Sequence, residues 1–219
     1  MKLEKSDFRK LSNKERAELY ADLKSHDELY VGSVISIRTK IHLRRLNTLH
    51  RFMGGVSNKK ILDAGAGEGY FLSTIKAKEK IGIELSEKRV ITALKLFPNL
   101  RISVADVRNL PFSNNSFDVI VCSEVLEHVD GFERAIQEFK RCIKPDGCVI
   151  LSFPNENTVA FGRLLLLKFP LHELDHVNSL TPLDIEKYLG KKYESSNIPP
   201  LPYPWCLYQI YKFSAKNFK

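Results

Sequence analysis

The stretch ILDAGAGEGYF, residues 61–71, decides how this chain folds. A short apolar run that ends near Asp63 and continues into Gly65, Gly67 and Gly69 is typical of a buried parallel strand that turns tightly onto a helix. Because glycine has no Cβ atom, the backbone of such a turn can approach a ligand closely. The geometry suits a nucleotide, although dinucleotide dehydrogenases also begin with a glycine-rich turn.

The bulk composition indicates one domain with an extension. The chain has 219 residues, 43% of them hydrophobic, which is enough to bury a single substantial core. It contains no run of eighteen apolar residues, and its first residues, MKLEKSDFRKL, lack the apolar centre of a secretory signal. We therefore expect a cytoplasmic protein.

The four cysteines do not suggest a metal site or a disulfide framework. Cys122, Cys142, Cys148 and Cys206 show no CxxC spacing, and three of them stand among apolar residues or in a predicted helix. We expect buried free thiols, and no metal ion.

The basic charge lies on the flanks of the chain. Residues 1–60 hold 14 basic and 7 acidic side chains, whereas residues 61–183 hold 14 and 16. This distribution favours an appended basic helical element that faces an anionic partner or substrate, with a merely solvated helix face as the alternative.

Residues 1–58 are predicted to form a helical extension and residues 59–219 an α/β domain. The pattern SNKE at Ser12–Glu15 predicts a capping box, and apolar spacing predicts a second, basic amphipathic helix over 33–52. From Lys59 onward, strands and helices alternate, as in an α/β sheet. The predicted strands are KILDAG, KIGIELS, LRISVADV, FDVIVCSE and GCVILSFP, and the predicted helices span 69–78, 87–96 and 131–143.

The carboxyl-terminal third follows a different pattern. The sequence KPDG, residues 144–147, predicts a turn between a helix and a strand. An apolar insertion at about 155–181 precedes a helix that begins at Thr181-Pro182. The last segment is predicted to form a strand at the edge of the sheet.

Three carboxylates are predicted to gather around the glycine turn. Glu84 ends the second strand, where a carboxylate can accept hydrogen bonds from both hydroxyls of a ribose. Asp106 ends the third strand and could accept from an adenine amino group. Asp63 would repel a pyrophosphate but would suit a cationic amino acid tail. The pattern therefore favours a nucleoside with a cationic tail over a nicotinamide dinucleotide.

The motifs ILDAGAGEGYF, GIELS, VADVRNLPFSNNSFDVIVCSEVLEHV and CIKPDG resemble, in order and spacing, those of class I S-adenosylmethionine-dependent methyltransferases of the type 11 group. The resemblance covers about residues 59–154. It implies a doubly wound, Rossmann-like sheet of seven strands, mostly parallel with the last strand antiparallel. It also implies S-adenosyl-L-methionine as the cofactor.

The resemblance also implies roles for individual residues. Asp63, Gly65 and Gly67 would meet the methionine part of the cofactor, Glu84 the ribose, and Leu85 the adenine. Asp106 and the backbone N–H of Val107 would bind the edge of the adenine ring. Ser123 and Glu124 would lie between cofactor and acceptor, although Glu124 could equally serve as a charge at a helix amino terminus.

Methyl transfer needs a base only when the acceptor atom carries a proton that must leave. His176, in DHVNSLTP, and His128, in LEHV, are the candidates, with His172 a weaker one. His128 could instead be structural.

Other functions compete with this interpretation. A nucleobase methyltransferase would fit the net charge of +8, but the fourth strand ends in CSEV rather than in an Asn/Asp-Pro-Pro-aromatic sequence. Cys122 could be a nucleophile for pyrimidine methylation, but a buried strand cysteine is the better account. A protein that binds S-adenosylmethionine without catalysis is a further alternative.

The acceptor is predicted from the apolar segment 159–171, which contains LLLLKFP. It would cover a lipid, isoprenoid or lipid-linked glycan, or contact an anionic membrane surface beside the basic helix; alternatively it packs on the domain itself. A soluble small molecule is the rival acceptor, and RNA is the third.

Overall fold

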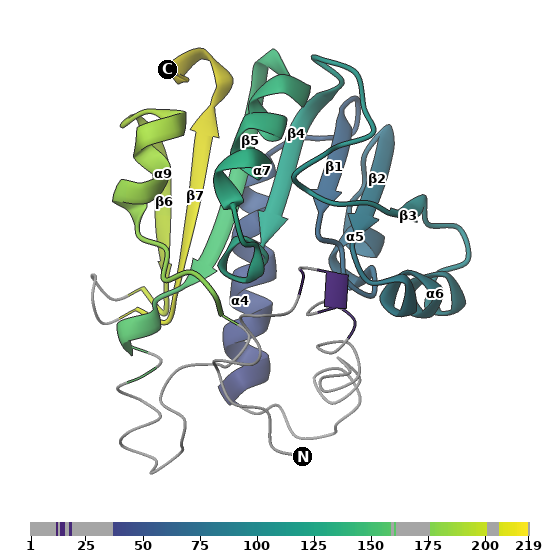
Figure 1. Cartoon of the computed structure of the whole chain (residues 1–219), viewed down its shortest axis with the longest axis horizontal. Helices are drawn as coiled ribbons and strands as arrows, with labels where there is room; N and C mark the ends of the chain where they lie inside the picture. The colour runs from purple at the N-terminus through teal and green to yellow at the C-terminus, as the bar shows by residue number, and fades with distance from the viewer. Residues whose placement is uncertain are drawn as a thin grey trace.

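The computed structural model describes residues 12, 14–15, 18, 37–158, 160, 176–200 and 206–218. Among them, seven strands form one sheet in the order β3-β2-β1-β4-β5-β7-β6, with β7 antiparallel to both of its neighbours (Figure 1). The strands are β1 (Lys60–Ala64), β2 (Glu79–Glu84), β3 (Ile102–Val104), β4 (Phe117–Ser123), β5 (Ile143–Pro154), β6 (Tyr193–Ile198) and β7 (Tyr208–Ser214). This is the expected mostly parallel sheet with its last strand antiparallel.

Helices cover both faces of the sheet (Figure 1). They are α4 (Ile37–Met53), α5 (Tyr70–Thr74), α6 (Glu87–Leu96), α7 (Phe132–Cys142) and α9 (Pro182–Leu189), with short 3₁₀ turns η1 (Leu126–His128) and η2 (Ala215–Asn217). Helix α4 packs on one face through Leu49, Phe52 and Met53. Helices α7 and α9 pack on the other.

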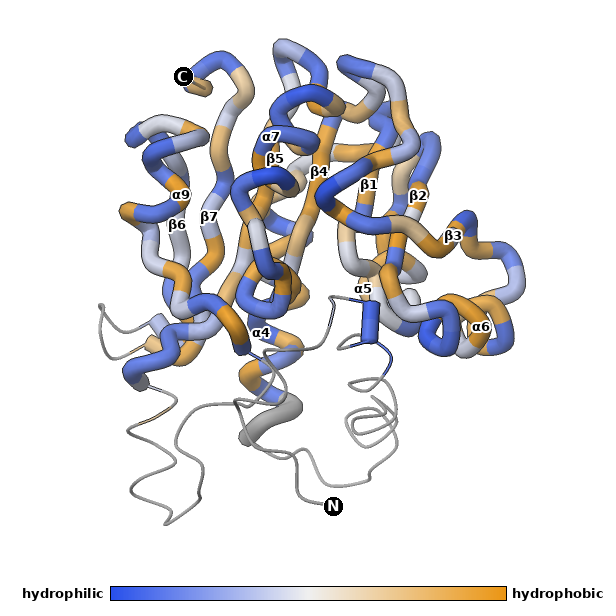
Figure 2. Tube along the Cα trace, viewed as in Figure 1, coloured by the Kyte–Doolittle hydropathy of each residue, from blue (hydrophilic) through white to orange (hydrophobic). Residues whose placement is uncertain are grey.

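The central strands are apolar on both sides because both faces of the sheet are covered. In β4, Val119 and Val121 join the core beneath α4, whereas Ile120 and Cys122 join the core beneath α7. Figure 2 shows this apolar character along β4 and β5. Because the interiors of these strands are apolar, the polar residues of the sheet are found where the strands end.

Most of the predicted elements are confirmed. All five predicted strands form, and α6 matches the predicted range 87–96. The helix predicted over 69–78 is shorter, because α5 ends at Thr74. The helix predicted over 33–52 is observed from Ile37, and its first predicted residues lie outside the described part of the chain.

Two predictions about the carboxyl-terminal third are wrong. The last strand, β7, is not at the edge: it pairs with β5 on one side and β6 on the other. The sequence YESSNI of β6 is polar, because an edge strand has one exposed side, and it therefore escaped prediction. Residues 144–147 do not form a separate turn either. They belong to β5, whose register against β4 shifts between Phe117 and Val119.

Several smaller expectations can also be checked. The capping box at Ser12 is confirmed, because the Glu15 carboxylate accepts from the Ser12 backbone N–H at 2.8 Å and the Ser12 hydroxyl accepts from the Glu15 backbone N–H at 3.3 Å. All four cysteines are buried and free. Most of the apolar segment 159–171 lies outside the described residues. No helix within the described ranges has both the length and the apolarity needed to cross a bilayer.

Candidate functional site

The polar residues predicted for the site stand at the end of the sheet where the parallel strands finish. Strands β2, β1, β4 and β5 are neighbours and run parallel, so their carboxyl ends lie together. In register, Asp63 pairs with Gly82 and Val121, and Ser123 pairs with Ser152. Loops at this edge of an open α/β sheet are where ligands usually bind.

The glycine turn after β1 is tied to β2 by three hydrogen bonds. The backbone N–H groups of Gly65 and Ala66 both donate to the carbonyl of Ile83 at 2.8 Å, and the Gly67 N–H donates to Glu84 Oε2 at 3.0 Å. Gly65 and Gly67 have φ angles of 87° and 55°. A Cβ atom on Gly65 would also overlap the side chain of Val125, so this position requires glycine.

Asp63 and Glu84 are two buried carboxylates beside this turn. Asp63 is 3% exposed and Glu84 is 7% exposed. Among the described residues, Asp63 Oδ2 has no hydrogen-bond partner. Burial, together with the nearby charge of Glu84, raises the pKa of Asp63 to about 7. Within the part of the chain that the structure describes, no hydrogen-bonded positive group therefore compensates the Asp63 carboxylate.

Glu84 has a different environment from Asp63. Its Oε2 accepts from Gly67 N–H, and its Oε1 accepts from Ser86 N–H at 2.9 Å. Because each carboxylate oxygen has two lone pairs, both oxygens can accept a second hydrogen bond. Glu84 can therefore hold the turn and bind two ligand hydroxyls at the same time.

The residues predicted to bind adenine lie farther along the same edge. Both oxygens of Asp106 already accept from the Arg108 guanidinium, at 2.7–3.1 Å. Burial raises the pKa of Asp106, but hydrogen bonds from Arg108 outweigh it, so the pKa is lowered. The side chain of Val107 is buried in the core, which leaves its backbone for a ligand. Leu85 stands in the bend between β2 and α6. The adenine roles of these residues stay predictions.

Beyond β4, helix α4 contributes to the site through Arg45. Arg45 Nη1 lies 3.1 Å from Glu124 Oε2, and the Arg45 side chain is 13% exposed. Glu124 Oε1 accepts from the Ser152 hydroxyl at 2.9 Å, and Ser152 Oγ is 2.8 Å from Ser123 Oγ. Glu124 has a left-handed backbone, with φ 57°, which is uncommon outside glycine and often marks functional positions.

Arg45 departs from the expectation that the basic helix predicted over 33–52 directs its charges toward an anionic partner. Arg44 and Arg51 are exposed, but Arg45 points toward Glu124 and also lies over the ring of Tyr208, at 5.3 Å from its centroid. A hydrogen-bonded, paired arginine positions a carboxylate and does not recruit an anionic surface.

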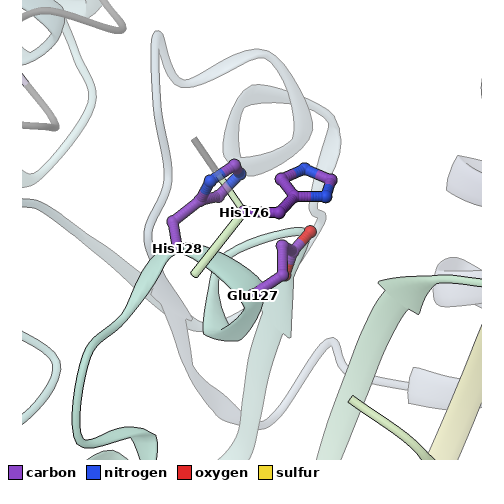
Figure 3. A group of neighbouring side chains, drawn as sticks. All are labelled: Glu127, His128 and His176. Carbon is purple, nitrogen blue, oxygen red and sulfur yellow. The ribbon is translucent and has the colours of Figure 1, made fainter. Parts of the chain in front are cut away.

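A second group of polar side chains follows immediately. Glu127 and His128 belong to η1, and the fold brings His176, 48 residues after His128, next to them. Figure 3 shows the Glu127 carboxylate directed toward the His176 ring, with the His128 ring beside it. The rings are edge-to-face, with centroids 4.7 Å apart. His176 Nδ1 is also hydrogen-bonded to Glu156 Oε1.

Several of these residues were not identified from the sequence. Arg45, Glu127, Ser152 and Glu156 reach the site only through the fold. For Glu127 a signal existed, because it stands next to His128 in the LEHV motif. Cys122, considered as a nucleophile, is 1% exposed, and burial raises its pKa well above the usual value. A reactive thiolate is therefore disfavoured.

The central part of the chain is similar to known proteins. Residues 62–151 match the model of a family described as a methyltransferase domain. A probable S-adenosylmethionine-dependent methyltransferase of Mycolicibacterium smegmatis is 30% identical over 150 residues, which cover 64% of this chain and 56% of that protein. A ubiquinone biosynthesis O-methyltransferase of a Shewanella species is 28% identical over 154 residues, which cover 64% and 65%. This chain thus spans just over half to about two thirds of these relatives.

A solved structure has the same fold. The S-adenosylmethionine-dependent methyltransferase of Mesorhizobium loti superposes with a TM-score of 0.61 over 80% of this chain and 97% of its own, at 18% identity. S-adenosylmethionine is the cofactor that the matched family implies. The residues present fit it, since the buried Asp63 Oδ2 without a hydrogen-bond partner suits an ammonium group and Glu84 suits a ribose. Residues 62–151 of this chain are therefore similar to the methyltransferase domain family, and the chain has the fold of a solved S-adenosylmethionine-dependent methyltransferase.

Proposed function

We propose that this protein transfers a methyl group from S-adenosylmethionine to a small-molecule or lipid-like acceptor. The observation that carries the proposal is the pair of buried carboxylates, Asp63 and Glu84, on either side of the glycine turn. Asp63 would bind the cationic amino group of the methionine part, and Glu84 both ribose hydroxyls. A pyrophosphate would place further negative charge beside Asp63, which disfavours a dinucleotide.

The chain has little covalent chemistry to perform in this reaction. When bound, S-adenosylmethionine supplies a methyl group already activated by the sulfonium. The protein must hold the acceptor atom in line with that methyl group, and such orientation can contribute roughly 7–11 kcal/mol. A proton acceptor is needed where the acceptor atom is a hydroxyl oxygen. His128 and His176 stand beyond Glu124 and remain the predicted candidates.

The acceptor class is inferred from relatives and from the charge distribution. One relative is named as an O-methyltransferase of ubiquinone biosynthesis, and from it we take only methyl transfer to a hydroxyl oxygen. RNA is less favoured, because Arg45 pairs with Glu124 and does not add to the exposed basic face of α4. The exposed side chains Lys40, Arg44 and Arg51 remain for contact with an anionic membrane surface.

Turnover with methyl-labelled S-adenosylmethionine tests the proposed reaction. The full chain would be incubated with a phenolic isoprenoid, a soluble catechol or total RNA, and label would be followed in organic extract, aqueous product and precipitated RNA. We expect label in one of the first two fractions, together with S-adenosylhomocysteine. Label confined to RNA would support the alternative acceptor. Cofactor binding without methyl transfer to any of the three acceptors would support the alternative of a protein that binds S-adenosylmethionine without catalysis.

Glu84 should determine cofactor affinity. In Glu84→Ala the ribose loses two charge-assisted hydrogen bonds, each worth roughly 1.5–3 kcal/mol, so the affinity for S-adenosylhomocysteine should fall at least about tenfold. Calorimetry measures the change, and circular dichroism checks the fold. Glu87→Ala, on the exposed first turn of α6, is the matched control and should bind as the wild type does. Equal affinities for both variants would contradict the assigned ribose site.

Asp63 should make cofactor binding depend on pH. Below about pH 7 the buried carboxyl is protonated in the ligand-free protein, whereas an ammonium group beside it favours the ionised form. Binding must then release a proton, so affinity should fall as pH falls from 8 to 6, by at most about tenfold per pH unit. Calorimetry in two buffers of different ionisation enthalpy counts the proton. Asp63→Asn should bind more weakly and lose this proton release; unchanged release would assign it to another group.

A further inference from the structure

The histidine and glutamate cluster beyond β4 has the composition of a metal site. One ligand atom from each of Glu127, His128 and His176 lies within 4.8 Å of the others (Figure 3). The ligands of a bound transition metal, each at about 2.0–2.2 Å from the ion, lie about 3–4 Å apart. Small side-chain rotations would therefore bring the three atoms into coordination distance.

The backbone holds the three residues in place. The Glu127 carbonyl accepts from the backbone N–H groups of Val177 and Asn178, at 2.8 and 3.0 Å. The Asn178 side-chain amide donates to the carbonyls of Leu126 and Val129, at 3.0 and 2.6 Å. These four bonds fasten the segment after His176 to the turn that carries Glu127 and His128. A site fixed in this way needs little reorganisation to bind an ion.

The charges around the cluster favour a cation. Glu127 is 1% exposed, and its Oε2 has no hydrogen-bond partner among the described residues. The carboxylates of Glu124 and Glu156 lie close enough to Glu127 to interact with its charge. In this region three carboxylates stand near one guanidinium, that of Arg45. Such negative charge is costly to bury without a positive partner.

The donor set also has the support that metal sites commonly show. A histidine ligand usually binds a carboxylate through its other ring nitrogen, which fixes its orientation. Glu156 is hydrogen-bonded to His176 Nδ1, so Nε2 is the nitrogen that would coordinate an ion. Two imidazoles and one carboxylate suit divalent transition metals such as Mn²⁺, Fe²⁺, Co²⁺ or Zn²⁺ better than Ca²⁺, which prefers oxygen ligands only.

We propose that Glu127, His128 and His176 form a binding site for a divalent transition metal ion, with Glu156 as the positioning residue of His176. This assignment revises the expectation of no metal and makes both histidines ligands instead of proton acceptors. Three protein ligands leave an open position, where an acceptor hydroxyl could bind and lose its proton more readily. That last role rests on the proposed methyl transfer, whereas the ion site itself does not.

Metal binding by an untagged, full-length chain tests the proposal. After treatment with chelator and removal of the chelator, Mn²⁺ binding would be followed by electron paramagnetic resonance and Co²⁺ binding by visible absorption. We expect one saturable site per chain. Glu127→Gln and His176→Asn should each weaken binding at least tenfold. Glu156→Gln should weaken it about 10–100-fold, with His176 still a ligand in the Co²⁺ spectrum.

The control is His50→Asn, because His50 bonds Thr74 on α5 and stands outside the cluster. It should bind the ion as the wild type does. Absence of saturable binding of Mn²⁺, Co²⁺ and Zn²⁺ to the wild type would overturn the proposal, as would binding that survives both ligand substitutions. Calorimetry with S-adenosylhomocysteine in chelator separates the two proposals: cofactor binding without ion binding refutes only the metal site, and the reverse refutes only the methyltransferase.

Discussion

The hydrogen bond from the Gly67 N–H to Glu84 Oε2 is the contact on which the geometry of the site depends. It joins the loop after β1 to the end of β2, next to the two bonds that Ile83 accepts from the same loop. The turn can form only because Gly65 and Gly67 adopt positive φ angles and because Gly65 leaves room for Val125. With the turn fixed in this way, Asp63 and Glu84 stand on two neighbouring strands beside it, where we propose that they bind one ligand.

A second layer of contacts extends this site beyond β1 and β2, toward the region proposed for the acceptor. The parallel order β1-β4-β5 places Ser123, Glu124 and Ser152 at the same edge. Helix α4, which precedes the sheet in the chain, reaches the edge through the pair between Arg45 and Glu124. Helix α4 is thus structurally part of the site, although the sequence suggested a separate element for a charged partner. The division at residue 58 stays a prediction.

The sequence was sufficient where local patterns determine structure. Asp63 and Glu84 could be predicted as site residues because each stands near the end of a short apolar strand, at a fixed distance from the glycines. Helix α6 could be predicted because its cap, Ser86, and its apolar spacing are both visible within one short stretch of sequence. Strand β6 could not be recognised, because an edge strand such as YESSNI lacks an apolar run. The prediction that β7 is an edge strand was wrong for the same reason, because β7 is internal only through its pairing with β6, which was not predicted.

The cluster of Glu127, His128 and His176 shows a different limit. Each histidine was a candidate on its own, but 48 residues separate them. Spacing along the chain does not reveal that the backbone N–H groups of Val177 and Asn178 donate to the carbonyl of Glu127. Likewise, nothing local pairs Arg45 with Glu124 across 79 residues. Ion pairs and ligand sets built from distant segments depend on tertiary packing, and they become visible only when the strand order is known.

The most direct test of this account is a crystal structure of the chain with S-adenosylhomocysteine. The account predicts both ribose hydroxyls within about 2.7–3.2 Å of the Glu84 carboxylate, and the ligand's ammonium group beside Asp63 Oδ2. The region past the sulfur should open toward Glu124 and the two histidines. A ligand whose ribose lies away from Glu84, or whose amino group avoids Asp63, would contradict the central claim.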